Sequence, residues 1–162
     1  MKKTLSLLAM ALFFATLSLA QTSTYILVRH AEKDTSVKTN PDLALSKEGE
    51  QRAINLVAAL KDYTIDAVYS TNYIRTKSTV TPVAKKFEKE IQTYNPSKVF
   101  VEQLLQQKGK TVLVAGHSNT IPALANALLK EDRFKALDES VYNKIFIVTV
   151  SADKAEVKLL EY

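Results

Sequence analysis

The chain contains no cysteine and only two histidines among its 162 residues. The absence of cysteine excludes disulfide bonds and thiolate chemistry, and it fits an exported protein that does not depend on oxidation for stability. There is no internal repeat, low-complexity tract or linker, and no run of basic residues. The formal net charge of +5 is a mild excess that does not suggest binding to nucleic acid or to a membrane surface.

The first 20 residues have the pattern of a secretory signal peptide. A positive "MKK" precedes an uncharged apolar stretch of 16 residues, and Ser18 and Ala20 occupy the −3 and −1 places before Gln21. We therefore expect residues 1–20 to be removed and residues 21–162 to be exported, to the periplasm or outside the cell, with no stable membrane association. A retained membrane anchor is the alternative, although the stretch is shorter than the ~20 residues that span a bilayer.

Residues 21–162 suit one domain with a proper core, and strand-like and helix-like segments alternate along them. Strands are predicted at 24–29, 66–70, 91–94, 111–116, 144–150 and 155–162, and helices at 45–63, 73–90, 97–109 and 120–130. Repeated strand-then-helix units favour a mostly parallel sheet with helices on both faces. The fold class is therefore a three-layer α/β/α sandwich with a C-terminal antiparallel hairpin.

Three residues are expected to mark the ends of these helices. Ser46 is a natural N-cap, whose hydroxyl can accept a hydrogen bond from the first turn. Pro82 lies inside a helical pattern, where we expect a kink or an early break. Gly109 is expected to stop the helix that precedes strand 111–116.

Arg29 and His30 follow the first predicted strand directly, in "TYILVRH". An arginine at the end of a buried strand is costly unless an anion meets its charge, and its planar guanidinium suits two phosphate oxygens. A neutral histidine beside it presents one ring nitrogen with a free lone pair, as a nucleophile or a base. The dipeptide alone is a weak motif, and it also fits an ordinary strand end with solvated side chains.

His117 repeats this arrangement between a predicted strand and a predicted helix, in "AGHSNTIP". Helix N-termini attract anions through unpaired backbone N–H groups, and Gly116 allows close approach of the backbone. Arg75 begins the helix that follows strand 66–70. Because ligands of such sheets bind outside the carboxyl ends of the strands, we expect both histidines and both arginines to meet at one anion-binding site.

Four segments between residues 26 and 124 resemble, in order, the motifs of the histidine phosphatase superfamily, also called the phosphoglycerate mutase-like superfamily. "LVRHAEKD" is similar to its RHG signature, and "DLALSKEGEQRA" to its D-x-x-L-T-x-x-G-x-x-Q-A segment. "VYSTNYIRTKST" is similar to its V-Y-S-S-P-L-x-R-A-x-Q-T segment, and "LVAGHSNTIPAL" to its second-histidine motif. The short phosphohistidine phosphatases are the most similar branch, although an exported protein would not meet a cytoplasmic phosphorelay partner.

The resemblance implies that His30 takes the phosphoryl group and that water hydrolyses the resulting phosphohistidine. It implies a phosphate pocket made by Arg29, Arg75 and His117, with His117 also part of the catalytic machinery, and it requires no metal or cofactor. The chemistry agrees, because phosphoryl transfer needs in-line positioning and stabilisation of charge on the equatorial oxygens. The expected partner is a small phosphorylated substrate.

The chain departs from the family motifs at several positions. Ala31 replaces the usual glycine, Asn72 the common proline, and Thr76 the common alanine. Ser118 and Asn119 replace a glycine pair. Asn119 is therefore a candidate donor to the substrate phosphate, and a helix cap is the alternative.

The general acid of the family has no clear counterpart. In many members it is a carboxyl group between the second arginine and the second histidine, where this chain has Glu88, Glu90 and Glu102. All three have the pattern of solvated surface charges, and Glu32 is not at the position that the family uses. Without an acid, the favoured substrates are phosphoramidates, acyl phosphates or aryl phosphates, whose leaving groups depart without protonation.

Two alternatives to a phosphatase stay open. The missing acid also fits a non-catalytic phosphate-binding domain on the same fold. A metal site on both histidines is a third hypothesis, but it requires a further ligand such as Asp or Glu, and two flanking arginines would repel a cation.

Overall fold

The structure is a computed structural model that describes residues 21–36 and 40–162, so the predicted leader over residues 1–20 lies outside the described residues. In that part of the chain, no helix is long and apolar enough to cross a membrane. The elements are β1 Ser23–Arg29, α1 Lys47–Ala59, β2 Ala67–Ser70, α2 Ile74–Lys86, β3 Ile91–Thr93, α3 Lys98–Gln106, β4 Thr111–Gly116, α4 Thr120–Leu129, β5 Lys144–Val150 and β6 Ala155–Glu161.

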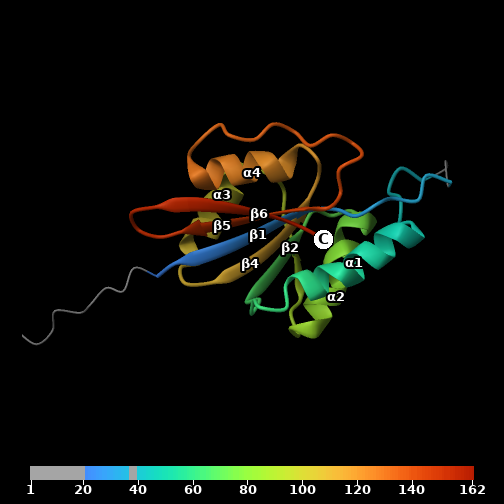
Figure 1. Ribbon diagram of the computed structural model, residues 1–162, viewed down its shortest axis with the longest axis horizontal. Helices are drawn as coiled ribbons and strands as arrows, with labels where there is room; N and C mark the ends of the chain where they lie inside the picture. The colour runs from blue at the N-terminus through green and yellow to red at the C-terminus, as the bar shows by residue number, and fades with distance from the viewer. Residues whose placement is uncertain (1–20, 37–39) are drawn as a thin grey trace, which may run out of the picture.

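The strands form one mixed six-stranded sheet in the order β3-β2-β4-β1-β5-β6. Strands β3, β2, β4 and β1 pair in parallel, and β5 and β6 add an antiparallel hairpin next to β1. Helices α1 and α2 cover one face of the sheet, and α3 and α4 cover the other (Figure 1). The predicted three-layer α/β/α sandwich with its C-terminal hairpin is confirmed.

Strand β1 shows why the central strands consist of continuous apolar residues. Successive side chains of a strand point to opposite faces, so Tyr25 and Leu27 join the core beneath α3 and α4. Ile26 and Val28 join the core beneath α1 and α2. Because both faces are covered, all four side chains are almost completely buried.

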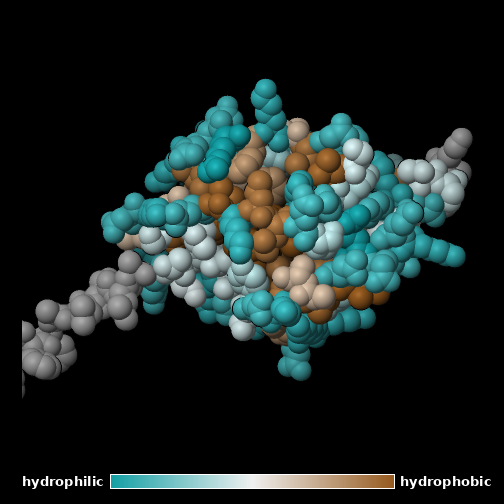
Figure 2. Space-filling view, viewed as in Figure 1, coloured by the Kyte–Doolittle hydropathy of each residue, from teal (hydrophilic) through white to brown (hydrophobic). Residues whose placement is uncertain are grey.

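The hairpin closes the sheet with the edge strand β6. On the face shown in Figure 2, hydrophobic side chains gather over α4 and the β5–β6 hairpin, and hydrophilic side chains surround them. The charged side chains of Glu156, Lys158 and Glu161 are exposed along β6. Charges on an edge strand oppose pairing with a further strand.

Helix α1 begins as predicted and fixes the loop that follows β1. The backbone N–H of Gly49 donates to the Ser46 hydroxyl at 3.2 Å, which confirms Ser46 as the N-cap. A Cβ on Gly49 would lie 2.2 Å from the carbonyl oxygen of Glu32. Glycine therefore allows the segment just after His30 to pack directly against the first turn of this helix.

Two expectations about helix ends need correction. Helix α2 continues through Pro82 to Lys86, so the early break does not occur. Val83, directly after the proline, is fully buried, and we attribute the continuation to this packing, which compensates for one missing helical hydrogen bond. Helix α3 ends at Gln106, and Gly109 instead provides a φ of +70° in the turn before β4.

Candidate active site

The carboxyl ends of β1 and β4 bring the two histidines together. These strands pair in parallel, with Arg29 in register with Gly116, so the residues that follow lie at the same edge of the sheet. His30 and His117 follow them, and their ring centroids lie 5.4 Å apart with the ring planes at 68°. The prediction that both histidines meet at one edge is confirmed.

His30 is buried, with 4% of its surface exposed. Its Nδ1 lies 2.8 Å from the Ala31 carbonyl oxygen, which can only accept, so Nδ1 donates and Nε2 keeps the lone pair of the neutral ring. Burial lowers the pKa of His30 to about 4, against the opposing effect of the hydrogen bond to Ala31. The charges of Arg75, Arg29 and His117 lower it further. The ring is therefore neutral at pH 7 and has a nucleophilic nitrogen.

Arg29 is 1% exposed, and the segment that precedes β5 binds one side of its guanidinium. Nη1 donates to three backbone carbonyl groups of residues 138–141, at 2.9 to 3.1 Å. Nη2 donates to Glu139 Oε2 at 2.7 Å. The Tyr142 ring stacks on the guanidinium, with 4.1 Å between its centroid and Cζ. The negative charge expected beside this buried arginine is thus supplied in part by Glu139.

Arg75 lies in the first turn of α2, where two neighbours hold its side chain. Its Cζ is 4.4 Å from the centroid of the Tyr73 ring, and its Nη1 is 3.6 Å from Asp42 Oδ1. Asp42 also accepts a hydrogen bond of 2.9 Å from the backbone N–H of Ile74. The aspartate of the second motif therefore pairs with Arg75 and caps the helix that carries it.

Each of the two arginines has one buried donor, its Nε–H, that makes no hydrogen bond among the described residues. Among the described residues, three buried side-chain nitrogen or oxygen atoms have no hydrogen-bond partner, and two of these are Nε of Arg29 and Nε of Arg75. The third is the hydroxyl of Tyr162, which packs on the α1–α2 side of the core. A buried charged donor without a partner is costly, so these two N–H groups favour a bound anion.

His117 is held from both sides. Its Nε2 lies 3.0 Å from the hydroxyl of Thr71, and its backbone N–H donates to the Thr120 hydroxyl at 2.9 Å. The Tyr73 ring lies perpendicular to it, 5.1 Å away between centroids. Burial lowers the pKa of His117, and the positive charges of the two arginines add to this effect. In the free protein, this ring is also neutral at pH 7.

The glutamates considered as general acids lie elsewhere or are already engaged. Glu88, Glu90 and Glu102 are exposed, as expected for solvated surface charges. Both carboxylate oxygens of Glu32 accept hydrogen bonds from Arg52, at 2.6 to 2.9 Å. Burial raises the pKa of Glu32, but the hydrogen bonds from Arg52, a backbone hydrogen bond and the charges of Arg52 and Arg29 together lower it by more, so the group stays ionised.

Sequence reasoning missed Glu139 and Tyr142. The hydrogen bond from the Ser118 hydroxyl lowers the pKa of Glu139, and the charge of Arg29 adds to it, so this group is a carboxylate at pH 7. The segment has no periodic pattern, which is why it was not noticed. An indirect signal is the C-terminal hairpin: its first strand, β5, pairs antiparallel with β1 and so begins where β1 ends, beside Arg29.

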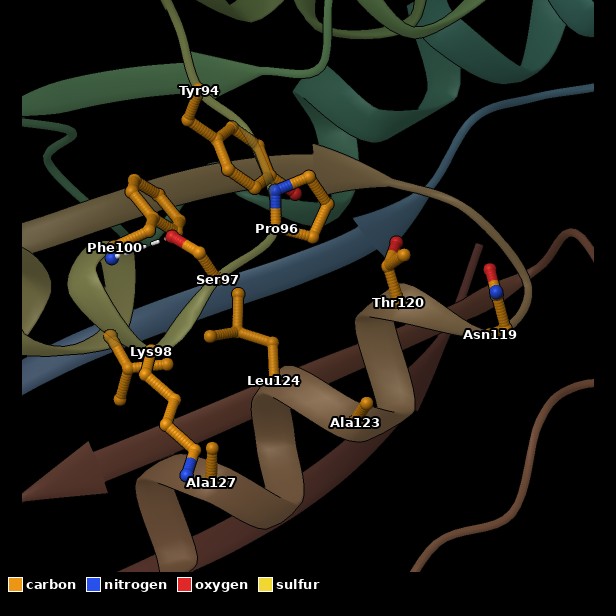
Figure 3. A pocket seen from close by; sticks show the side chains of 11 residues that line it. Tyr94, Pro96, Ser97, Lys98, Phe100, Asn119, Thr120, Ala123, Leu124 and Ala127 are labelled. Atoms are coloured by element: carbon orange, nitrogen blue, oxygen red, sulfur yellow. Dashed lines mark hydrogen bonds between the residues drawn. The ribbon is translucent and has the colours of Figure 1, made fainter.

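Asn119 lies at the N-terminus of α4, but its side chain makes no capping hydrogen bond. It lies at one end of a cavity of about 310 Å³ between α3 and α4 (Figure 3). The interior is largely apolar, with the stacked rings of Tyr94 and Phe100 at 4.0 Å between centroids and with Leu124 opposite. A contact of Asn119 with a substrate phosphate stays a prediction.

In residues 21–36 and 40–162, no group of three or more His, Cys, Asp or Glu side chains is arranged to hold a metal ion. The metal-site hypothesis therefore has no candidate ligand set in that part of the chain. The fold, together with paired histidines and arginines at the carboxyl edge of its sheet, defines a phosphoglycerate mutase-like α/β/α protein.

Comparison with known proteins agrees with this class. Residues 25–96 match the sequence model of the Histidine phosphatase superfamily (branch 1), and none of the curated proteins matches the chain. Among similar solved structures, mycobacterial glucosyl-3-phosphoglycerate phosphatase has a TM-score of 0.68 at 14% identity, covering 87% of this chain and 98% of its own. A phosphohistidine phosphatase SixA from Agrobacterium tumefaciens has a TM-score of 0.65 at 18% identity, and the match covers 86% of this chain and 98% of its own. The protein histidine phosphatase SixA complexed with tungstate has a TM-score of 0.68 at 15% identity, and the match covers 85% of this chain and 96% of its own.

At these identities the structural likeness shows the fold alone. The family match adds a likeness in sequence, because it includes the segments that carry His30 and Arg75. It covers residues 25–96, which is less than half of the chain, and His117 lies outside it.

Proposed function

We propose that the protein is a metal-independent phosphatase that forms a phosphohistidine on His30. One observation carries the proposal: a buried, neutral His30 with a free Nε2 lies beside two arginines whose buried Nε donors have no partner among the described residues. The first feature supplies a nucleophile, and the second supplies donors for an oxyanion. A histidine with only a structural role would not need two arginines with unpaired donors beside it.

The reaction has two displacements at phosphorus. Nε2 of His30 attacks the phosphoryl group, an N–P bond forms, and the leaving group departs with the electrons of its bond to phosphorus. Water then attacks the phosphohistidine, the N–P bond breaks, and inorganic phosphate and neutral His30 are regenerated. The Nε donors of Arg29 and Arg75 stabilise the negative charge on the equatorial oxygens in both steps.

The substrate class follows from the missing acid. Among the described residues, the carboxylates at the site already bind cations, since Glu139 pairs with Arg29 and Asp42 with Arg75. We therefore expect a small phosphorylated compound whose leaving group needs no proton, such as an aryl phosphate, an acyl phosphate or a phosphoramidate. The similar structures carry the names of phosphatases with different substrates, which supports the reaction class and no particular substrate.

The test compares phosphate release from an aryl, an acyl and an alkyl phosphate. The proposal is supported if the unmutated protein releases phosphate and the His30→Ala variant does not, although this variant still binds inorganic phosphate. Faster turnover of aryl and acyl phosphates than of the alkyl phosphate supports departure without protonation. A chelator should have no effect.

A non-catalytic phosphate-binding domain is the second candidate, because of the missing acid. It predicts binding of inorganic phosphate by the unmutated protein without release from any of the three substrates. Turnover that persists in His30→Ala would contradict the proposed nucleophile.

Export is a further part of the proposal and depends on the sequence pattern of residues 1–20. N-terminal sequencing of the protein recovered after expression with its leader is the test. A mature N-terminus at Gln21 supports export, and an intact Met1 contradicts cleavage.

A further inference from the structure

Two buried threonines connect His117 to the first turn of α2. Thr71 follows β2 and is 4% exposed, and Thr76 is completely buried. The Thr71 hydroxyl lies 3.0 Å from Nε2 of His117 and 3.0 Å from the Thr76 hydroxyl. The Thr76 hydroxyl in turn lies 3.2 Å from the carbonyl oxygen of Tyr73.

The carbonyl at the end of this chain favours one direction for the hydrogen bonds in it. A carbonyl oxygen can only accept, so Thr76 gives its single hydroxyl proton to Tyr73. Thr76 must then accept from Thr71, which thereby uses its own single proton. Thr71 is left as an acceptor towards His117, so Nε2 of His117 carries a proton. In the opposite direction, Thr76 would donate to Thr71 and Thr71 to Nε2, and the 3.2 Å contact between the Thr76 hydroxyl and the Tyr73 carbonyl would be left without a proton.

We propose that Thr71 and Thr76 are positioning residues that hold His117 in the Nε2–H tautomer and leave Nδ1 as the ring atom that engages a substrate phosphate. His30 has the other tautomer, with its proton on Nδ1 and its lone pair on Nε2. The histidines of one site thus present different nitrogens, one to attack phosphorus and one to bind an oxygen. The role towards phosphate rests on the proposed function, whereas the tautomer does not.

Other features of the site agree with this assignment. Nε2 is the ring nitrogen of His117 that contacts Thr71, and Nδ1 makes no hydrogen bond among the described residues. Because burial and the arginines lower the pKa of His117, the ring is neutral at pH 7 and carries its one proton on either Nε2 or Nδ1. A phosphate monoanion can bring its own proton to Nδ1, which gives an imidazolium that donates to a phosphoryl oxygen.

Thr76 is a feature of this chain, because the motif that it belongs to commonly has alanine at that position. With alanine there, the Thr71 hydroxyl would be free to donate to the ring or to accept from it. The threonine hydroxyl removes that freedom. Both threonine hydroxyls are then fully paired, as buried polar groups generally are.

Imidazole nitrogen resonances test the tautomer directly. The chain has only two histidines, so a long-range ¹H–¹⁵N correlation spectrum of the ¹⁵N-labelled protein contains two imidazole patterns, and His30→Asn assigns them. At pH 7 we expect His117 to have a protonated Nε2 and an unprotonated Nδ1, and His30 the reverse. A protonated Nδ1 in neutral His117 would overturn the inference.

Variants separate the two threonines from a general effect on folding. In Thr76→Ala and in Thr71→Val, we expect His117 nitrogen shifts that average between both tautomers, whereas Thr71→Ser should preserve the wild-type pattern. Thr81→Ala is the matched control, because Thr81 lies on the same helix and bonds its hydroxyl to the backbone carbonyl of Lys77, outside the site. Wild-type shifts in a folded Thr76→Ala protein would overturn the inference, even where Thr71→Val does not fold.

Titration with inorganic phosphate tests the consequence for binding. We expect Thr76→Ala to weaken phosphate binding by about 3- to 10-fold, the usual range for loss of one hydrogen bond, and Thr81→Ala to leave it unchanged. Unaltered binding in a Thr76→Ala protein with mixed tautomers would overturn the role towards phosphate. Absence of turnover in the wild type would count against the proposed function alone, because neither measurement needs turnover.

Discussion

The low pKa of His30 predicts an unusual pH dependence of the reaction. In the proposed mechanism His30 must be neutral to attack phosphorus, and burial is the main cause that lowers its pKa to about 4, compared with the ordinary 6.5. At pH 5.5, an ordinary histidine is about 90% protonated, whereas His30 would be about 3% protonated. The rate at pH 5.5 should therefore stay close to its plateau, about 10-fold above the value for an unperturbed ring.

The assay is kcat/KM for an aryl phosphate between pH 3 and pH 8, expressed per concentration of substrate monoanion, the form that can bring a proton to His117, because phosphate monoesters themselves ionise near pH 6. Since kcat/KM reports the ionisation of the free enzyme, its acid limb should have a midpoint near pH 4. The ¹⁵N shifts of His30 give the same midpoint without turnover. A midpoint near 6.5 in both measurements would refute the argument that burial controls this ring.

A charge-removing pair of variants tests the second cause of the shift. After burial, Arg75 is the charge that lowers the pKa of His30 most. Arg75→Gln should therefore raise this pKa, but not to its ordinary value, because the ring stays buried. Arg133→Gln removes the same charge from an exposed position and should leave the pKa unchanged. Equal effects of both variants would indicate a general effect of net charge.

Three further predictions concern stability and substrate binding. Because the pKa of His30 is lower in the folded state than in the unfolded state, the unfolded state binds more protons below pH 6.5. Urea denaturation should therefore show that the wild type loses up to about 3 kcal/mol relative to His30→Asn between pH 7 and pH 4, and equal pH slopes would contradict this. Glu139→Gln removes an anion that competes with the substrate phosphate for Arg29, so KM should fall by about 2- to 5-fold at low salt. A higher KM would contradict this and show that the carboxylate positions the arginine. Gly49→Ala places a Cβ 2.2 Å from the Glu32 carbonyl oxygen and should destabilise the fold by about 2 kcal/mol, whereas Gln51→Ala, at an exposed position of the same helix, should change stability by less than about 0.5 kcal/mol.

The fold could be predicted because each element has a strong local pattern. Strands β1 and β4 each contain an uninterrupted apolar segment, over residues 25–28 and 112–115, as expected where helices cover both faces of a sheet. Ser46 and the positions of Ala53 and Leu56 defined α1 without any tertiary information. The early helix break predicted at Pro82 was wrong because proline in a sequence indicates only the lost hydrogen bond, whereas the packing of Val83 depends on the whole sheet.

The site could be predicted only in part, for a related reason. His30 and His117 were recognisable because parallel strands end at a common edge, so a position in the sequence implied a position in space. The partners of Arg29 were not, since Glu139 and Tyr142 are more than 100 residues away from it in a segment without periodicity. The chain from His117 through Thr71 was equally invisible, because hydroxyl orientation depends on atomic contacts.

The same arrangement recurs at both arginines, and under the proposed function it would leave the pocket ready for a phosphate before one binds. Arg29 uses its Nη atoms to bind residues 138–141, and Arg75 uses Nη1 to approach Asp42. An aromatic ring stacks on each guanidinium, Tyr142 in one case and Tyr73 in the other. Because the outer nitrogens are fixed, the direction of each Nε–H is fixed as well, and donors that are already oriented need no reorganisation when charge develops on the phosphoryl oxygens.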